Sequence, residues 1–551
     1  MLAEETTGIP GWFTWAAGYG YDANGSLASQ TYPKGLVVTY APNALGQATQ
    51  AGSFASGVQY HPNGAIKQFT YGNGLVHTMV QNARQLPGRS TDTGGALDQQ
   101  YHYDANGNVG RIEDHLDVNR QKWLTYDGLD RLTEAAAHVF GGDSVHRFTY
   151  DPLDNLRSWK LGGVKDFGQY QYDTSNRLSA IQTTGGTALH ALTYDVQGNL
   201  ASKDGSSYSF DYGNRLRLAT VPGNVENFVY DGHGRRVLSS RSVGGYTSSM
   251  YTQSGQVVHQ WSGPQQKRLD HVYLGGSLVA VREEAFADGA LSVKYQHTDA
   301  LGSPVAMTNA AGAVVERTNY DPYGGAIGKV VDGVGYTGHV MDGSTGLTYM
   351  QQRYYDQGIG RFLSVDPISS IGEPVTGFNR YWYASNNPYR FTDPDGRKIQ
   401  LVADATAADI KAYADARKYL DAAGAGGTLT KLDEHAETVF LQAKPGSGQM
   451  QYDPKSNVIT WDPTSGLETT EGEVQSPALQ LVHEGDHALG DVTGTMASGQ
   501  QNDNFYDNDE ERRVIDGAER DAARKLGEPI RTNHRGTPVK VESSTSREKV
   551  E

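Results

Sequence analysis

The residues with the clearest chemistry lie in the run His483-Glu484-Gly485-Asp486-His487. Ser476 and Pro477 precede this run and favour a helix start, because serine caps free N–H groups and proline suits the first turn. Two histidines four residues apart then share one helix face, where both imidazoles can bind one zinc ion. Glu484 lies between them and can accept a proton from a water on that metal. The pattern is that of an HExxH zinc hydrolase.

The alternative is a surface helix that carries two histidines and two acids without function. Leu479, Leu481 and Val482 make the preceding turn apolar, which favours a helix that is buried where the histidines begin. Gly485 lowers helix stability by on the order of 1 kcal/mol relative to alanine. This glycine either admits a close backbone approach or weakens the prediction.

A catalytic zinc ion usually has three protein ligands, and the segment 507–519 supplies candidates for the third. The segment favours a helix with an apolar stripe, and Glu511 lies one turn before Ile515 of that stripe. We therefore expect Glu511 to be the ligand, with Glu510 as the alternative and Glu519 as a weaker one. The competing interpretation is that these acids cap and solvate the helix start, which is common for acids in a first turn.

Length and composition set the context of this motif. The chain has 551 residues, which predicts two or three domains. It contains no cysteine, so neither disulfides nor thiolate metal sites can stabilise it, and this fits a reducing compartment. We expect neither a signal peptide nor a membrane anchor, because no basic, apolar leader and no run of roughly 18 apolar residues is present.

A repeat that begins with an aromatic residue and aspartate accounts for the high glycine and tyrosine content. Measured from Asp104, successive copies are 23, 24, 22, 22, 16 and 20 residues apart, with an outlying copy at Tyr21. In each copy the aromatic residue ends a strand, Asp, Asn or Gly adopts the positive φ of a turn, and Leu or Val starts the next strand. One hairpin cannot bury its aromatic face, so the repeats predict a long antiparallel sheet that curls. A β-solenoid with a filled core is the alternative.

These copies resemble the YD repeats of Rhs proteins and of the C components of Tc toxins, whose repeats wind into a hollow β shell. The resemblance covers roughly residues 20–397. It implies a shell over residues 1–340 and a core-end segment over residues 341–397. The motifs that carry it downstream are 295–304 (YQHTDALGSP), 347–356 (LTYMQQRYYD), 360–367 (GRFLSVDP), 379–388 (NRYWYASNNP) and 392–396 (TDPDG).

In that family, paired Asp-Pro motifs bound an aspartyl self-cleavage site that frees a C-terminal toxin inside the shell. The resemblance implies a dyad of Asp366 and Asp393, with Arg353 as the supporting basic residue. Two carboxylates that share a site have divided pKa values, which leaves one acid and one base. Either Asp-Pro alone is more simply a turn starter. The first motif lacks the usual final glycine, and Arg397 stands where the family has an apolar residue; we expect the scissile bond near Arg397.

Beyond residue 397 the Tyr-Asp period stops and Ala-rich helical patterns begin, which predicts a separate domain over residues 398–551. Segments 449–454 and 457–463 favour a hairpin directly before the zinc helix, a ledge on which an extended substrate could lie by analogy with zincins. The HExxH run, the 507–514 helix and 526–531 resemble the NleD-type zinc metallopeptidase effectors. That resemblance implies proteolysis of proteins; the targets known in the family are host signalling kinases.

Charge separates this C-terminal domain from a nuclease. Residues 398–551 contain 27 acidic and 17 basic residues, whereas a nuclease needs a basic surface to meet phosphates. Arg531 and His534 follow the Glu511 helix and could stabilise a tetrahedral intermediate, as donors aimed at developing negative charge do. Ordinary surface contacts are the alternative for both residues.

Together these patterns predict a multidomain chain: a mainly antiparallel β shell of YD repeats, a self-cleaving aspartyl segment, and an α+β, zincin-like domain that hydrolyses target-cell proteins with Zn²⁺. The expected partners are a protein substrate and an immunity, chaperone or secretion partner, but not nucleic acid. We expect the chain in the bacterial cytoplasm before export and delivery into a target cell. The alternatives are a delivery or adhesion scaffold with a non-catalytic binding tail, and a zinc hydrolase of cell-wall peptides.

Overall fold

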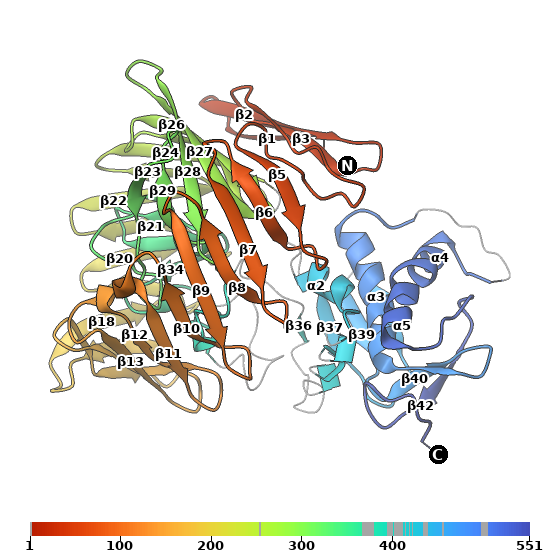
Figure 1. The fold of residues 1–551 in the computed structure, drawn as a ribbon. Helices are drawn as coiled ribbons and strands as arrows, with labels where there is room; N and C mark the ends of the chain where they lie inside the picture. The colour runs from red at the N-terminus through yellow and green to blue at the C-terminus, as the bar shows by residue number, and fades with distance from the viewer. Residues whose placement is uncertain are drawn as a thin grey trace. The chain divides into compact units, whose positions relative to one another are not determined.

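The computed structural model consists of two compact units (Figure 1). The first comprises Met1–Val365 and Tyr381–Gly396, and the second Asp366–Arg380 and Arg397–Glu551. The structure describes residues 3–252, 255–365, 379–393, 400–401, 412–413, 415–417, 419–420, 423–433, 439–454, 457–497 and 505–550. Among these residues no helix has both the length and the apolar character that crossing a membrane requires.

The first unit is built of antiparallel sheets in which strands adjacent in sequence pair with one another. The first sheet contains β1 (Glu4–Ile9), β2 (Phe13–Tyr21), β3 (Leu27–Thr31) and β4 (Val37–Thr39). The second contains β5 (Ala55–Tyr60), β6 (Ile66–Tyr71), β7 (Val76–Gln81), β8 (Pro87–Asp92), β9 (Leu97–Tyr103), β10 (Val109–Asp114), β11 (Lys122–Tyr126), β12 (Leu132–Ala136), β13 (Val145–Tyr150), β14 (Leu156–Leu161) and β15 (Lys165–Phe167).

The third sheet is the largest, and a small fourth sheet follows it. The third contains β16 (Gln169–Tyr172), β17 (Leu178–Gln182), β18 (Ala188–Tyr194), β19 (Leu200–Lys203), β20 (Ser206–Phe210), β21 (Leu216–Val221), β22 (Asn224–Tyr230), β23 (Arg236–Arg241), β24 (Gly245–Tyr251), β25 (Val257–Ser262), β26 (Lys267–Leu274), β27 (Ser277–Ala285), β28 (Leu291–Thr298), β29 (Pro304–Thr308) and β30 (Val314–Arg317). The fourth contains β31 (Gly333–Val334), β32 (Val340–Asp342), β33 (Leu347–Met350), β34 (Arg353–Asp356) and β35 (Arg361–Phe362).

The repeat unit predicted from the sequence is confirmed. Tyr126 ends β11 and Leu132 starts β12, and the turn between them is closed by Asp127, whose Oδ1 accepts hydrogen bonds from the N–H groups of Leu129 and Arg131. Asp130 has a φ of 62° in this turn. The equivalent turn residues in the other copies also have positive φ: Gly107, Asp154, Asn176, Gly198, Asn214 and Gly234.

Several repeats are tied to the preceding one by a tyrosine hydroxyl. The hydroxyl of Tyr126 donates to the carbonyl oxygen of Val109 at 2.9 Å, and that of Tyr150 donates to Leu132 at 2.6 Å. The same bond recurs from Tyr172 to Leu156 (2.7 Å) and from Tyr230 to Leu216 (2.6 Å). Because the acceptor starts the second strand of the previous repeat, the bond keeps successive hairpins in register.

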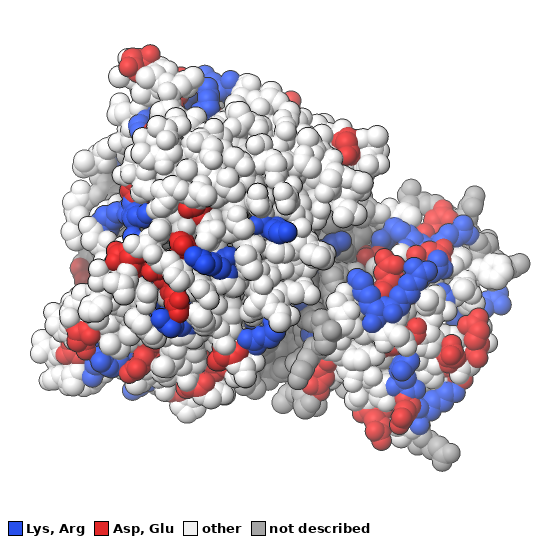
Figure 2. Space-filling view, viewed as in Figure 1, with Lys and Arg blue, Asp and Glu red and all other residues white. Residues whose placement is uncertain are grey.

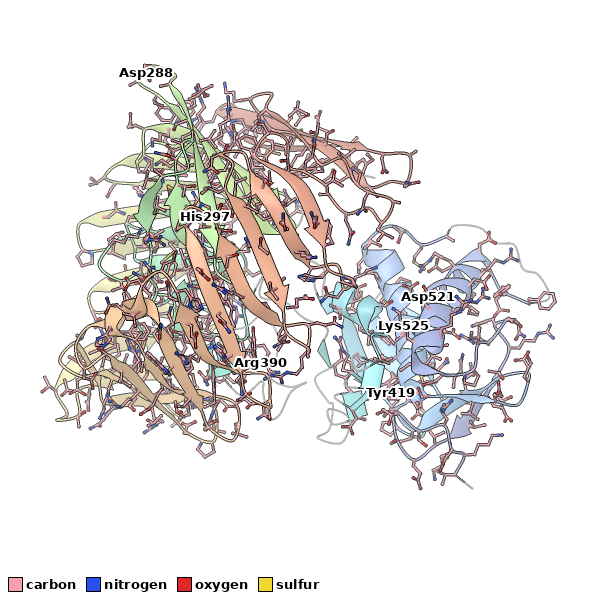
Figure 3. All side chains as sticks on the ribbon, in the orientation of Figure 1. Asp288, His297, Arg390, Tyr419, Asp521 and Lys525 are labelled. Carbon is pink, nitrogen blue, oxygen red and sulfur yellow. The ribbon has the colours of Figure 1, made fainter. Side chains whose placement is uncertain are left out.

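The curl of the sheets brings distant strands together. The Tyr71 hydroxyl donates to the Gln296 carbonyl at 3.0 Å, across 225 residues of sequence. His297, labelled in Figure 3, contacts Asp92 through Nδ1 at 2.7 Å. The predicted antiparallel sheet that curls is thus confirmed, although it is divided between β15 and β16.

The interior of the curl is packed rather than hollow around these strands, in contrast to what the resemblance implied. Trp159 of the repeats and Tyr355 of β34 are fully buried in one aromatic core with Tyr323 and Tyr383. The fourth sheet therefore supplies the inward side of the core that a single layer of hairpins lacks. A cavity of about 500 Å³ remains beside this core.

The second unit combines two sheets with four α-helices among its described residues. One sheet has the strand order β36-β37-β39-β38 and the other β41-β40-β42. The elements are β36 (Gln400–Leu401), α2 (Gly427–Asp433), β37 (Phe440–Ala443), β38 (Met450–Asp453), β39 (Val458–Trp461), β40 (Ser465–Glu468), β41 (Val474–Gln475), α3 (Pro477–Val492), α4 (Asp509–Val514), a π-helical turn (Ile515–Glu519), α5 (Arg520–Leu526) and β42 (Thr537–Lys540).

Helix α3 starts where the sequence predicts. Ser476 caps it by accepting a hydrogen bond from the Leu479 N–H, and Pro477 occupies its first turn. Close packing explains why residue 485 is a glycine, because a Cβ atom there would lie 2.6 Å from Leu429 of α2. The predicted hairpin is also present as β38 and β39, but β40 and β41 separate it from α3.

The repeat-to-repeat bond can be tested in the first unit. Tyr126→Phe removes the hydroxyl that serves Val109, so we expect a loss of about 1 kcal/mol in unfolding free energy. Tyr212→Phe is the control, because this turn tyrosine is 98% exposed. The measurement is denaturant unfolding followed by tryptophan fluorescence. Equal stabilities of the two variants would contradict the assigned role.

Candidate metal centre

Helix α3 places the two histidines of the motif on one buried face. The Nε2 atoms of His483 and His487 are 3.2 Å apart. Both residues are buried, and so is Glu484 between them. Leu479, Leu481 and Val482 pack in the apolar core on the same helix, so the helix is buried where the histidines begin.

Glu511 of α4 completes the cluster. Its Oε2 lies 3.3 Å from Nε2 of His483 and 3.4 Å from Nε2 of His487. Potential ligand atoms of the three residues all lie within 4.8 Å of one another. Oε2 is buried and has no hydrogen bond of acceptable geometry among the described residues. Burial raises the pKa of the Glu511 carboxyl, but the two imidazoles outweigh burial and hold that pKa well below its usual value.

The two alternative acids occupy a different position, on the far side of the imidazoles. Glu519 contacts Nδ1 of His483 at 2.8 Å, and Glu510 contacts Nδ1 of His487 at 3.3 Å. Each acid is in turn bound by an arginine: Glu519 by Arg531 at 2.7 Å and Glu510 by Arg513 at 2.6 Å. A carboxylate at Nδ1 fixes the ring and leaves Nε2 for a metal, so these acids orient the histidines.

Electrostatics agrees with this division of roles. Burial raises the pKa of Glu519, but Arg531 and His483 outweigh it and lower the pKa to about 2. Burial likewise raises the pKa of Glu510, while Arg513 and His487 bring it down to about 2. Both acids are therefore anionic at neutral pH and can hold the imidazoles by charge-assisted hydrogen bonds.

A π-helical turn aligns Glu511 with Glu519. In a regular α-helix eight residues advance by about 800°, which would leave the two side chains about 80° apart. The π-helical turn Ile515–Glu519 adds one residue, and Gly517 within it departs from helical geometry at φ −103° and ψ −106°. One extra residue removes about 100° of rotation, so both acids face His483. Sequence reasoning missed this turn, for which Gly517 is the only visible signal.

An open cleft of about 790 Å³ borders the cluster. Glu484, His487 and Glu511 line one side, and Met450 and Tyr452 of β38 line another. Among the described residues β38 lies at the edge of its sheet, next to β39. The cleft therefore joins the acidic and imidazole groups to an edge strand.

The two basic residues suggested for intermediate stabilisation differ in position. Arg531 is buried against Glu519 and also lies 3.0 Å from Nδ1 of His483. It is therefore placed to hold the imidazole in its orientation. His534 lines the cleft, with Nδ1 2.7 Å from Asp507 and Nε2 3.2 Å from Oε2 of Glu511.

The aspartyl segment is described in part. Arg353 contacts the Asp393 carboxylate at 2.6 Å, so these two predicted residues are brought together. Asp366 and Arg397 lie outside the described residues. Sequence reasoning missed His339, which is buried and whose Nε2 lies 2.9 Å from the carbonyl oxygen of Asp393. Burial lowers the pKa of His339, so the ring is neutral and Nε2–H donates to that oxygen.

Comparison with known proteins identifies the first unit. Residues 138–389 match the family model of the teneurin YD-shell. This part of the chain is therefore similar to a YD-repeat shell. The chain is 29% identical over 309 residues to the tRNA3(Ser)-specific nuclease WapA of Bacillus spizizenii, which covers 51% of this chain and 12% of that protein. It is 29% identical over 260 residues to double-stranded DNA deaminase toxin A of Burkholderia cenocepacia, which covers 45% and 17%.

A solved structure shares the fold of the YD repeats. The crystal structure of TcdB2-TccC3-Cdc42 matches with a TM-score of 0.53 and 19% identity, over 70% of this chain and 22% of that chain. This likeness shows that the repeat region shares its fold with that structure. The chain spans less than a fifth of the length of the two curated relatives.

Metal content tests the ligand assignment. Purified His483→Ala and Glu511→Ala chains should lose stoichiometric zinc, because two ligands hold the ion poorly. Glu510→Ala should retain zinc with about 10- to 100-fold weaker affinity, as expected for the loss of an orienting partner. The zinc content of each chain is measured by inductively coupled plasma mass spectrometry. The control is His138→Ala, a change at an exposed histidine. Zinc kept by the Glu511 variant and lost by the Glu510 variant would reverse the assignment.

Proposed function

We propose that this YD-repeat protein is a toxin whose second unit is a zinc-dependent endopeptidase acting on target-cell proteins. The observation that carries the proposal is the convergence of His483, His487 and Glu511 beside Glu484 in an open cleft. Two neutral imidazole nitrogens and one carboxylate are a donor set that zinc hydrolases use.

The residues fit a zinc ion on chemical grounds. Oε2 of Glu511 is buried and lies within 3.4 Å of Nε2 of both His483 and His487, so one cation could have all three atoms as ligands. Nδ1 of each histidine is already engaged by Glu519 or Glu510, so the ring nitrogens that remain are those that converge. A bound zinc ion would act as a Lewis acid and lower the pKa of a water toward about 7.

The chain itself supplies the proton transfers. Glu484 is the general base: its carboxylate takes a proton from the attacking water, whose oxygen adds to the peptide carbonyl carbon. Glu484 then returns that proton to the nitrogen as the C–N bond breaks, so the products are a carboxylic acid and an amine. His534 holds the Glu511 carboxylate in place from the cleft side.

The position of β38 at the edge of its sheet among the described residues supports a polypeptide substrate. An extended peptide can pair with an edge strand through backbone hydrogen bonds, and Met450 and Tyr452 of this strand line the cleft. Two of the relatives are named as a nuclease and a DNA deaminase. Acidic residues outnumber basic ones in residues 398–551, and the visible face of the second unit mixes both signs of charge (Figure 2), which does not favour a phosphate-binding surface.

In this proposal the YD shell serves delivery. The chain is exported from the bacterial cytoplasm and enters a target cell, and an immunity, chaperone or secretion partner protects the producer or assists export. The similarity of this chain to double-stranded DNA deaminase toxin A supports this role. A delivery or adhesion scaffold with an inactive tail, and a hydrolase of cell-wall peptides, are the competing functions.

We also propose that the core-end segment cleaves its own chain, with the scissile bond near Arg397. The contact between Arg353 and the Asp393 carboxylate supports this, because it holds one carboxylate of the predicted dyad in place. Asp366 would be the second carboxylate of the dyad. His339 adds a second constraint, since its N–H fixes the carbonyl of the same residue.

Loss of the base tests the peptidase. Glu484→Gln keeps the size of the side chain but cannot accept a proton, so hydrolysis of a protein substrate should fall at least about 10²- to 10⁴-fold while zinc is retained. Growth of cells that express the chain should recover. The control is Glu471→Gln, a change at an exposed acid.

The competing functions give other results. A Glu484→Gln chain that remains toxic would favour a binding tail. Preferential cleavage of peptides that contain D-residues would favour cell-wall substrates.

Self-cleavage gives a separate prediction. The purified chain should run as two fragments of roughly 400 and 150 residues under denaturing conditions, and Asp393→Asn should run as one band. Asp288→Asn, at an exposed turn, is the control. A wild-type chain that stays whole would contradict the proposal.

Two substitutions of His339 test whether its Nε2–H group is needed for cleavage, because they place an amide N–H at different distances from the backbone. A glutamine amide can place an N–H near the position of Nε2, whereas an asparagine amide resembles Nδ1. His339→Gln should therefore retain most of the cleavage rate, and His339→Asn should lose at least about tenfold. The measurement is the time course of fragment formation during refolding of each variant. Equal rates for the two variants would exclude a role for this bond.

A further inference from the structure

The cavity of about 500 Å³ in the first unit is lined by side chains of β8–β11, of the segment 299–322 and of residues 388–391. Its walls include the rings of Tyr101, Tyr320, Tyr336 and Phe391. A volume of this size suits a small organic ligand, and apolar walls with a few polar groups are typical of such sites.

Lys122 is the unusual member of this lining. Residues of a strand alternate between two faces, and in β11 Lys122 shares the face of the buried Leu124, while Trp123 between them is 44% exposed. The ammonium group thus points inward, where the repeats otherwise place apolar residues. Within the described part of the chain it makes no hydrogen bond and no ion pair.

The acids near Lys122 are committed elsewhere. Asp299 uses Oδ1 to accept the N–H groups of Leu301 and Ser303 in its own turn. Asp114 is held by two hydrogen bonds from Arg120. Burial lowers the pKa of the Lys122 ammonium, and Asp299 and Asp114 oppose this without reaching contact distance. A charge in this position is costly unless a ligand pairs with it.

A second donor in the same cavity lacks an acceptor. The hydroxyl of Tyr389 is buried and has no hydrogen-bond partner among the described residues, although tyrosine hydroxyls normally find one when buried. The cavity therefore presents two unused donors from segments far apart in sequence.

The charge of the lining favours an anion. Five basic and three acidic side chains line the cavity. The basic ones include Arg317, which donates to the carbonyl oxygens of Gly95 and Ala96, and Arg390, which donates to Asn108 in the turn between β9 and β10 (Figure 3). Burial raises the pKa of Asp299 and of Asp321.

We propose that this cavity is a binding site for a small organic carboxylate with an aromatic or other apolar body. The carboxylate accepts hydrogen bonds from Lys122 Nζ and the Tyr389 hydroxyl, and the apolar body packs against the tyrosine rings. The site lies within the first unit and is independent of the proposed zinc centre. It gives the YD shell a ligand-dependent stability, because a ligand that binds only the folded state shifts unfolding toward higher temperature.

The test is calorimetric titration of the full chain with benzoate, benzamide and inorganic phosphate as probes. We expect saturable benzoate binding, with benzamide about tenfold weaker or more because it lacks the charge that pairs with the ammonium. Lys122→Met should lower benzoate affinity at least about tenfold. Lys67→Met, at an exposed position of β6, should leave it unchanged.

A conservative variant covers the case in which Lys122→Met does not fold. Tyr389→Phe removes one hydroxyl only and should weaken benzoate binding by a few-fold, to about tenfold. Without ligand, Lys122→Met should unfold at a temperature equal to or above that of wild type, because an unpaired buried charge is removed. Absent benzoate binding, equal affinities of wild type and Lys122→Met, or phosphate binding at the same site as tightly as benzoate would each overturn the proposal.

Discussion

The hydrogen bond from a repeat tyrosine to the carbonyl of the preceding repeat, which recurs in several repeats, is the constraint on which the first unit depends. A single hairpin has one aromatic face and no partner layer, so it cannot be stable in isolation. The bond from Tyr126 to Val109 and its equivalents fix the spacing at which neighbouring aromatic faces merge into one surface. The curl that follows brings β28 against β6, and the fourth sheet then fills the interior. The core therefore depends on the register between neighbouring hairpins.

The second unit is organised by a different constraint, the pairing of buried carboxylates with imidazoles. Five ionisable side chains of the cluster, two histidines and three glutamates, lie in or at the edge of the core, and none of them is left without an opposite charge. Arg531 and Arg513 neutralise the outer acids. Such a network is stable only when every member is satisfied.

Much of this architecture was accessible from the sequence because it rests on local rules. The repeat turns follow from residues that tolerate positive φ, and the start of α3 follows from Ser476 and Pro477. The choice of Glu511 over Glu510 for the inner position followed from the side of the helix that carries Ile515. Contacts across long separations were not accessible: the packed interior of the curl, β40 and β41 before α3, and the approach of His339 to Asp393 depend on tertiary packing that no periodicity encodes.

The π-helical turn also carries a consequence for how this domain can change over time. Insertions and deletions in a surface helix are usually tolerated when they fall near a loop. Here, however, the one extra residue of the π-helical turn decides which way the side chains that follow it point. A lineage that lost one residue between Val514 and Arg520 would regain an unbroken helix and a more regular backbone, yet Glu519 would swing away from His483 by about a quarter turn. A change of length in this π-helical turn would therefore separate Glu519 from His483 and remove the contact that orients the imidazole.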